Sequence, residues 1–211
     1  MPARVVARVP PTLIRRGRVL RPTDAHDVYA HPRPEFQRLE RAGALHRLAD
    51  GHYAVVPDDR VGQDWLPGLE AVALGIAGTG GHINDAALMG ISAARVHGAL
   101  ARAVNIATVA VDRHRRTLQL ADRHAQVLFV RRDIAALDLQ RHHTELGDGW
   151  ITTIEQTLLD LIARPHLGDV PDAAHDAITA LLPRADNDLL RNLAQTQRRR
   201  TALDRVLAER P

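Results

Sequence analysis

The sequence predicts an α+β protein in which a small basic unit precedes a larger, nearly neutral body. Residues 1–57 hold ten arginines and five acidic residues, a net charge of +5, whereas residues 58–211 hold 18 arginines and 20 acidic residues, a net charge of −2. Segments with helical spacing of apolar residues alternate with short β-branched runs. A basic head on a near-neutral body is typical of a nucleic-acid-binding module carried by another domain, although a solvated arginine-rich surface gives the same counts.

Three short helices are predicted near the N-terminus. Pro10-Pro11 can open a helix over roughly residues 11–16, because proline is tolerated in a first turn. Arg21-Pro22-Thr23-Asp24 begins a second helix of at most two turns. A third helix, over residues 34–42, starts with a proline and is stopped by Gly43 as a left-handed C-cap.

A hairpin follows the third helix. Asp50-Gly51 is a two-residue turn between residues 44–49 and 52–56, and glycine accepts the positive φ that such a turn requires. Three short helices and a hairpin are the order of a winged helix, with residues 34–42 as recognition helix and the hairpin as wing. We therefore predict a winged helix-turn-helix domain over residues 1–57.

The rest of the chain is predicted to combine helices with a small sheet. Residues 58–66 are polar and contain glycine, so we expect a linker there and a C-terminal domain over residues 67–211. Gly78-Thr79-Gly80-Gly81 is expected to be a loop. Helices are expected over residues 67–77, 85–100, 154–163, 171–182 and 186–209, strands over 105–111, 117–120 and 125–130, and a loop or short helix over 131–139.

The residue inventory excludes several classes of enzyme. The chain has no cysteine, which excludes disulfides, thiolate zinc sites and cysteine nucleophiles. It also has no lysine, because all 28 basic residues are arginine, and both Walker-type phosphate loops and Schiff-base enzymes need lysine. We find no assembled catalytic set and expect no enzyme.

Neither histidines nor acidic residues suggest a metal or catalytic centre. None of the twelve histidines has a convincing metal-ligand spacing, and the adjacent His142 and His143 face apart. Glu155 and Asp160 lie on different faces of the predicted helix, so an acid–base pair is not expected, and Glu155 is better explained as a cap. We expect no metal and no cofactor.

Two further patterns are explained by helix ends. Residues 75–81 superficially resemble a nucleotide loop, but they follow a helix instead of a strand and no lysine follows them. A capping box at the start of helix 154–163 can be made by either of two pairs, Thr152 with Glu155 or Thr153 with Gln156. Because the chain has no run of 18 apolar residues, no signal-peptide core and no cysteine, we expect a cytoplasmic protein without a membrane partner.

Three patches of the sequence resemble one known family. Arg38-Leu39 through Gly43, Leu45, Gly51, Tyr53 and Pro57 resembles the winged helix of the AbiEi family of antitoxins. Residues 91–100 are similar to the family's Ser-Ala-x-x-x-His-Gly helix, and residues 152–160 to its Thr-x-x-Glu-x-Thr-hydrophobic-hydrophobic-Asp segment. The patches cover most of residues 30–165. His31-Pro32-Arg33-Pro34 departs from the family, which more usually has a polar helix cap there, and residues 171–211 match no motif.

The resemblance implies a function that composition alone does not. The family's members are antitoxins of type IV toxin–antitoxin systems, paired with nucleotidyltransferase toxins. The resemblance therefore implies a protein that counters such a toxin, directly or through the toxin's target, and represses its own operon by binding double-stranded operator DNA. Dimerisation on inverted repeats fits such modules.

A winged helix indicates which residues contact DNA. With residues 34–42 in the major groove, Gln37 suits adenine, while Arg38 and Arg41 suit guanine. The candidates for phosphate contacts precede this helix or lie in the wing: Arg33, His46, Arg47, His52, Arg15, Arg16 and Arg18.

Two alternatives to the antitoxin remain. One is a plain winged-helix transcriptional regulator whose larger domain senses a ligand or forms a dimer. The other is an enzyme such as a nuclease guided by the winged helix; the lack of lysine and of a convincing carboxylate cluster counts against it. A nucleotidyltransferase reading frame directly downstream would favour the antitoxin over the plain regulator.

The recognition-helix assignment leads to a first prediction. Replacing Arg38→Ala together with Arg41→Ala should weaken operator binding without unfolding the protein, and loss of a phosphate contact should flatten the salt dependence of the affinity. A binding titration at several salt concentrations measures both quantities. Unchanged binding by the double variant would contradict the assignment.

Overall fold

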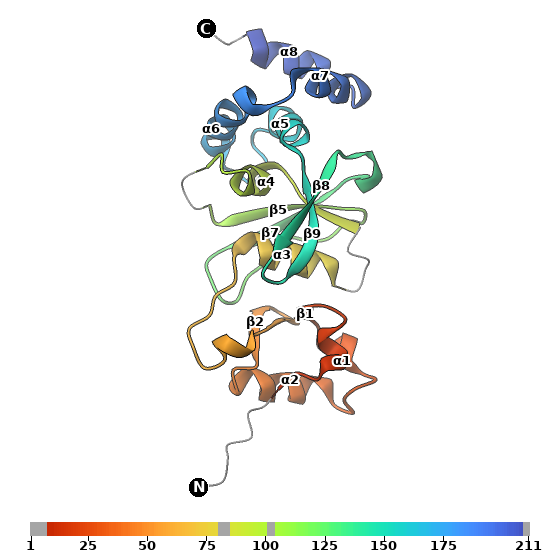
Figure 1. Cartoon of the computed structure of the whole chain (residues 1–211), viewed down its shortest axis with the longest axis vertical. Helices are drawn as coiled ribbons and strands as arrows, with labels where there is room; N and C mark the ends of the chain where they lie inside the picture. Colours follow the sequence, from red (N-terminus) through yellow and green to blue (C-terminus); the bar gives the residue numbers. More distant parts are fainter. Residues whose placement is uncertain (1–7, 80–84, 101–103, 209–211) are drawn as a thin grey trace.

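The computed structural model describes residues 8–79, 85–100 and 104–208. These residues form an α+β stack of layers (Figure 1). From the N-terminal end, the layers are helix α2 (Pro32–Arg41), a three-stranded sheet, helix α3 (Leu69–Gly78), a six-stranded sheet and a group of C-terminal helices. None of the helices in these ranges has the length and apolarity that a membrane crossing requires.

The N-terminal unit is built on an antiparallel sheet with the strand order β1-β3-β2. The first two helices expected from the sequence are single turns, because proline and glycine leave few consecutive helix-forming residues there. The residues between them form a strand that the sequence pattern did not predict. The elements are α1 (Pro11–Ile14), β1 (Val19–Leu20), the 3₁₀ turn η1 (Pro22–Ala25), β2 (Leu45–Ala49) and β3 (His52–Val55).

Helix α2 begins at Pro32, two residues before the predicted start. Both Pro32 and Pro34 fit into the first turn, where backbone N–H groups have no intrahelical acceptor to lose. The helix stops at Gly43, whose φ of +75° is the predicted left-handed conformation. Gly51 has a φ of +70° in the hairpin turn, and the strand register shifts between Arg47 and Ala49, which marks a β-bulge.

The small sheet is buried on both faces. Leu20, Tyr53 and Val55 belong to one apolar cluster with Phe36 and Leu39 of α2. The alternate residues of the same strands belong to a second cluster with α3: Val19, Leu48, Ala49 and Ala54. Because side chains alternate across a strand, one short sheet thus joins α2 to the body.

The body contains a mixed six-stranded sheet in the order β6-β7-β5-β4-β9-β8. The central pair β4–β5 is antiparallel, while β5–β7 and β4–β9 are parallel and both edge strands are antiparallel to their neighbours. The strands are β4 (Ala86–Leu88), β5 (Ile106–Val111), β6 (Leu118–Gln119), β7 (Gln126–Arg131), β8 (Leu139–Thr144) and β9 (Gly147–Thr152).

Helices cover both faces of this sheet (Figure 1). Helix α3 packs between the two sheets, and α4 (Gly90–Val96) and α5 (Ile154–Ala163) pack on the opposite face. Helices α6 (Pro171–Leu181), α7 (Asn187–Thr196) and α8 (Arg200–Ala208) enclose a separate apolar cluster with α4 and α5. Short 3₁₀ turns complete the chain: η2 (Asp58–Arg60), η4 (Ile134–Ala136) and η5 (Leu182–Arg184).

Two sequence predictions are wrong in the body, and one hairpin was not predicted. Residues 85–100 do not form one helix, because Ala86–Leu88 pairs on both sides as β4 and Gly90, with a φ of +51°, begins a separate helix. Sheet pairing here overrides the helix propensity of Ala-Ala-Leu. The expected helix 186–209 is two helices, broken where Arg198 has a φ of +56°. The hairpin of β8 and β9 was missed, since β8 is a polar edge strand without apolar alternation.

The expected loop over residues 78–81 falls largely outside the described residues. Gly78 ends α3 and Thr79 follows it, whereas Gly80 and Gly81 are not described. Glycine inside α3 has a different role, because Gly75 lies directly against strand β1. A Cβ added to Gly75 would lie 2.4 Å from Cγ2 of Val19, which no real contact allows. Gly75 therefore sets how closely the N-terminal unit approaches the body.

This close approach can be tested by paired glycine substitutions in α3. Gly75→Ala should lower the free energy of unfolding by about 1–3 kcal/mol, because the added methyl group overpacks the contact with Val19. Gly78→Ala is the matched control, since no atom lies within 4 Å of its added Cβ. Urea denaturation measures both; equal stability of the two variants would contradict the packing argument.

Candidate nucleic-acid interface

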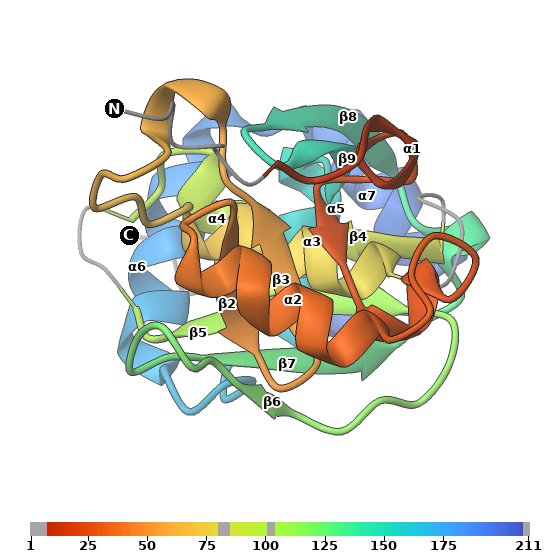
Figure 2. The ribbon, with the colours of Figure 1, turned by 90° about the horizontal axis from the view of Figure 1, so that it is seen from below.

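Helix α2 lies at the end of the molecule away from the C-terminal helices (Figure 1). Its inner face is fixed by Pro32, Phe36 and Leu39, which are buried, and the Phe36 ring meets the Tyr53 ring edge to face at 5.3 Å. The polar residues of the same helix are exposed as a consequence: Arg33, Gln37, Arg38 and Arg41. Seen from below, α2 lies in front of the small sheet, with α3 behind it (Figure 2).

A groove of about 430 Å³ separates α2 from the turn of the β2–β3 hairpin. Arg33 and Gln37 line it from the helix and Arg47 from the hairpin. Arg33 has no side-chain partner among the described residues, and Arg47 is held only by an exposed ion pair with Asp50 at 3.4 Å. Two arginines and a glutamine from separate elements thus converge on one groove, in which Glu40 and Asp50 supply opposite charge.

The other two candidates on α2, Arg38 and Arg41, do not line this groove, and each makes a contact within its own helix. Arg38 pairs with Glu35 one turn earlier at 2.8 Å. Nε of Arg41 donates a hydrogen bond to the carbonyl oxygen of Gln37 at 3.2 Å. Both remain exposed on the outer surface of the helix, but neither lines the groove.

His46 is turned toward the body instead of toward solvent. Its Nε2 lies 2.9 Å from Oδ2 of Asp122, whose side chain is 3% exposed, and its ring meets Trp65 edge to face. Burial raises the pKa of Asp122, but hydrogen bonds with His46 and Arg123 outweigh it and hold the pKa at about 2. His46 therefore fastens the hairpin to the body and is not available to bind phosphate.

His52 is also a poor phosphate ligand. Burial lowers its pKa, and the cations Arg21 and Arg115 lower it further, although a hydrogen bond with the carbonyl oxygen of Asp50 and the charge of Asp24 act in the other direction. The ring is therefore neutral at pH 7.

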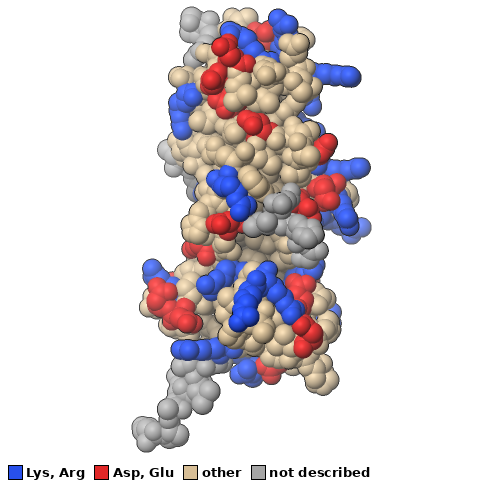
Figure 3. Space-filling view, turned by 45° about the vertical axis from the view of Figure 1, so that its right-hand side comes forward, with Lys and Arg blue, Asp and Glu red and all other residues tan. Residues whose placement is uncertain are grey.

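The three arginines near the N-terminus lie apart from the α2 groove. Arg16 is engaged by Asp27, with Nη1 2.9 Å from Oδ1, and by the carbonyl oxygen of Asp24. Arg15 and Arg18 are exposed and have no side-chain partner in the described ranges. Figure 3 shows basic side chains beside acidic ones on the N-terminal unit, as over the body.

A basic cluster that the sequence did not reveal adjoins the hairpin turn. Arg21 and His52 share a cavity of about 280 Å³ with Arg115 and Arg116 of the β5–β6 loop. Arg115 lies over the Phe129 ring at 5.5 Å, and burial, followed by the charge of Arg21, lowers its pKa. Arg116 is exposed and has no side-chain partner among the described residues. The basic turn 113–116 was visible in the sequence, but its place beside the hairpin depends on the fold.

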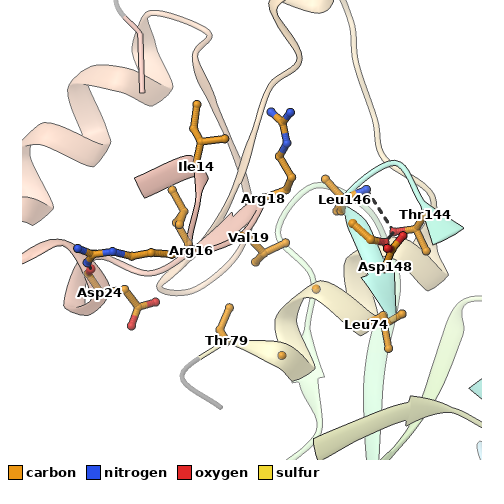
Figure 4. Close-up of a pocket in the computed structure, with 15 residues that line it drawn as sticks. Ile14, Arg16, Arg18, Val19, Asp24, Leu74, Thr79, Thr144, Leu146 and Asp148 are labelled. Carbon is orange, nitrogen blue, oxygen red and sulfur yellow. Dashed lines mark hydrogen bonds between the residues drawn. The ribbon is translucent and has the colours of Figure 1, made fainter. Parts of the chain in front are cut away.

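A second opening lies at the seam between the N-terminal unit and the body. It is a cleft of about 530 Å³. Residues around β1 form one wall, and α3 with the β8–β9 turn forms the other (Figure 4). Its apolar lining consists of Ile14, Val19, Leu20, Leu74 and Leu146.

The polar residues of the two body motifs are internal cross-links. Oγ of Ser92 accepts a hydrogen bond from the backbone N–H of Thr108 at 2.9 Å, and Nε2 of His97 lies 2.8 Å from the carbonyl oxygen of Thr152. Oγ1 of Thr152 and Oγ1 of Thr157 are 2.7 Å apart and buried. These contacts tie α4 and α5 to the sheet, so we assign them a structural role.

Glu155 and Asp160 have different partners, and the prediction that Glu155 caps its own helix is wrong. Thr153 is the N-cap of α5 and accepts from the N–H of Gln156. Glu155 instead accepts from the backbone N–H of Asp186 at 2.8 Å, beside the start of α7. Asp160, 3% exposed, pairs with Arg132 at 2.6 Å; burial raises its pKa, against the opposing effect of Arg132. Among the described residues, no three potential ligands come together to hold a metal ion.

Comparisons with known proteins leave the family open. No model of a known protein family matches the chain, and no curated protein matches it. A solved structure, the RV2827C protein from Mycobacterium tuberculosis, is similar over 98% of this chain and 84% of that chain, with 18% sequence identity and a TM-score of 0.47. At this level the likeness supports no statement about function.

The contact between His46 and Asp122 predicts a pH-dependent stability. Because the pKa of Asp122 lies below its ordinary value, its stabilising effect is complete above about pH 4 and is lost as the pH falls toward 2. Asp122→Asn should therefore cost ~1–2 kcal/mol of unfolding free energy at pH 6, and the difference from wild type should shrink between pH 4 and 2. Asp50→Asn is the exposed control, for which we expect no such trend. A difference that stays constant with pH would contradict the assignment.

Proposed function

We propose that this protein is an antitoxin that binds operator DNA through a winged helix in its N-terminal unit and counters a nucleotidyltransferase toxin. The proposal joins the resemblance to the AbiEi family with one structural observation, the groove between α2 and the β2–β3 hairpin. Arg33, Gln37 and Arg47 converge there from the two elements that a winged helix applies to DNA. Such a protein acts in the cytoplasm, where its operator lies.

The chemistry of the groove suits base recognition. With α2 in the major groove, Gln37 can bond to the N6 and N7 of adenine, and Arg33 to the O6 and N7 of guanine. Glu40 can accept from the N4 amino group of cytosine. Arg47 on the hairpin and Arg116 beside it suit phosphate oxygens, since both are exposed. Arg38 and Arg41 lie on the outer surface of α2, where they suit the flanking backbone.

The role of the body as antitoxin rests on the family resemblance. The polar side chains Ser92, His97, Thr152 and Thr157 of its motifs are engaged in internal hydrogen bonds, so contact with a toxin requires other residues. Two copies bound to an inverted repeat would place two α2 helices in successive major grooves.

DNA binding is tested with a duplex that carries the promoter of the protein's own operon. Arg33→Ala with Arg47→Ala should weaken binding by about 1–3 kcal/mol per lost contact and reduce the slope of log affinity against log salt by about 0.9 for each lost phosphate contact. Arg191→Ala on α7 is the control, because this exposed arginine is far from the groove. Equal affinities for all three proteins would exclude the groove as the binding surface.

Antitoxin activity is tested by growth rescue. We would induce the adjacent reading frame in a suitable host, alone and together with the full chain or its Arg33→Ala/Arg47→Ala variant. Point variants are preferable to deletion of residues 1–57, because deletion would expose the apolar face of α3 that packs on Val19, Leu48 and Ala54. Both proteins should restore growth, since the groove serves regulation. Toxicity that neither relieves would refute the antitoxin.

The cleft at the seam favours a second candidate, a plain transcriptional regulator. Ligand sites commonly form where two units meet, and a volume of about 530 Å³ is within the usual range for small molecules. Promoter binding without any rescue of growth would support this candidate.

A further inference from the structure

The cleft at the seam has a wall from each unit of the chain (Figure 4). Val19 comes from β1, Leu74 from α3 and Leu146 from the β8–β9 turn, so the three apolar side chains come from separate segments. Gly78 also lines the cleft, and a Cβ added there would touch no atom within 4 Å. The interior is therefore open space next to an apolar surface that could hold a small organic body.

The charged side chains that line the cleft have hydrogen-bond or ion-pair partners, with one exception among the described residues. Arg16 is paired with Asp27, Asp24 with Arg21 and Asp148 with His143. Arg18 also lines the cleft, and its guanidinium has neither a hydrogen-bond nor an ion-pair partner in the described part of the chain. Arg18 is thus the charged group of the cleft that is left without a partner, and guanidinium groups bind carboxylates, sulfonates and phosphates through paired hydrogen bonds.

We propose that the cleft binds a small organic anion with an apolar body, whose acidic group pairs with Arg18 and whose body rests on Val19, Leu74 and Leu146. Such a ligand would touch both units at once. Its binding energy would stabilise their docked arrangement and raise the melting temperature in proportion to the logarithm of ligand concentration.

Two fluorescent probes of nearly the same shape test the proposal on the full chain. One is 8-anilinonaphthalene-1-sulfonate, an aromatic anion; the other is N-phenyl-1-naphthylamine, the same body without the sulfonate. The wild-type protein should bind the anion saturably, with one site, and at least tenfold more tightly than the neutral probe. Equal affinity for the two probes would overturn the proposal.

Three variants locate the site. Arg18→Ala should remove the preference for the anion and leave binding of the neutral probe, whereas Arg15→Ala, an equally exposed and unpaired arginine outside the cleft, should change neither. Gly78→Leu should fill the cleft and abolish binding of both probes. Circular dichroism checks that each variant is folded. Wild-type binding by either Arg18→Ala or Gly78→Leu would overturn the assignment.

This inference stands apart from DNA binding, because the probe titrations contain no DNA. A failed titration with intact promoter binding would remove the ligand site alone. Saturable probe binding by a protein that binds no promoter duplex would leave the ligand site and remove the proposed function.

Discussion

The arrangement of the whole molecule depends on how closely α3 packs between its two sheets. On one side Gly75 lets Val19 of β1 approach, and on the other Gly149 of β9 leaves space for Leu74, since a Cβ there would lie 2.1 Å from Cδ2 of Leu74. Every residue of α3 from Leu69 to Leu74 is consequently buried, whereas an ordinary amphipathic helix has one face exposed to solvent. The packing of this short helix therefore fixes where α2, the β2–β3 hairpin and the cleft at the seam lie relative to the body.

The sequence predicted elements with strong local signals and missed those that depend on distant partners. Helix 154–163 has the predicted bounds, and Gly43 and Gly51 adopt the predicted left-handed conformation, because capping, periodicity and positive φ are local properties. Strand β4 has no β-branched residue and β8 has no apolar alternation, so both exist because neighbouring strands pair with them. No local rule finds such strands.

In the candidate site, too, the sequence predicted what depends on local spacing and missed what depends on distant partners. Residues one helical turn apart, such as Arg33 and Gln37, had to share a face of α2, and a hairpin directly after the helix had to bring Arg47 near them. Asp122, the partner of His46, lies 76 residues further along the chain, and the fold buries His52 near Arg21 and Arg115, so the loss of both histidines as candidate phosphate ligands could not be foreseen. Arg116 was not predicted as part of the site, because only the fold brings it beside the hairpin.

The anchoring of the hairpin has a consequence for recognition. The backbone N–H of Ala121 donates to the carbonyl oxygen of Leu48 at 2.8 Å, close to the contact between His46 and Asp122, so the outer edge of β2 is bonded to the body. The hairpin cannot swing freely about its base, and little conformational entropy is left to lose when it meets a partner. A surface held in this way selects partners by fixed shape, and a change in the body that shifts residues 121–122 would alter that shape directly.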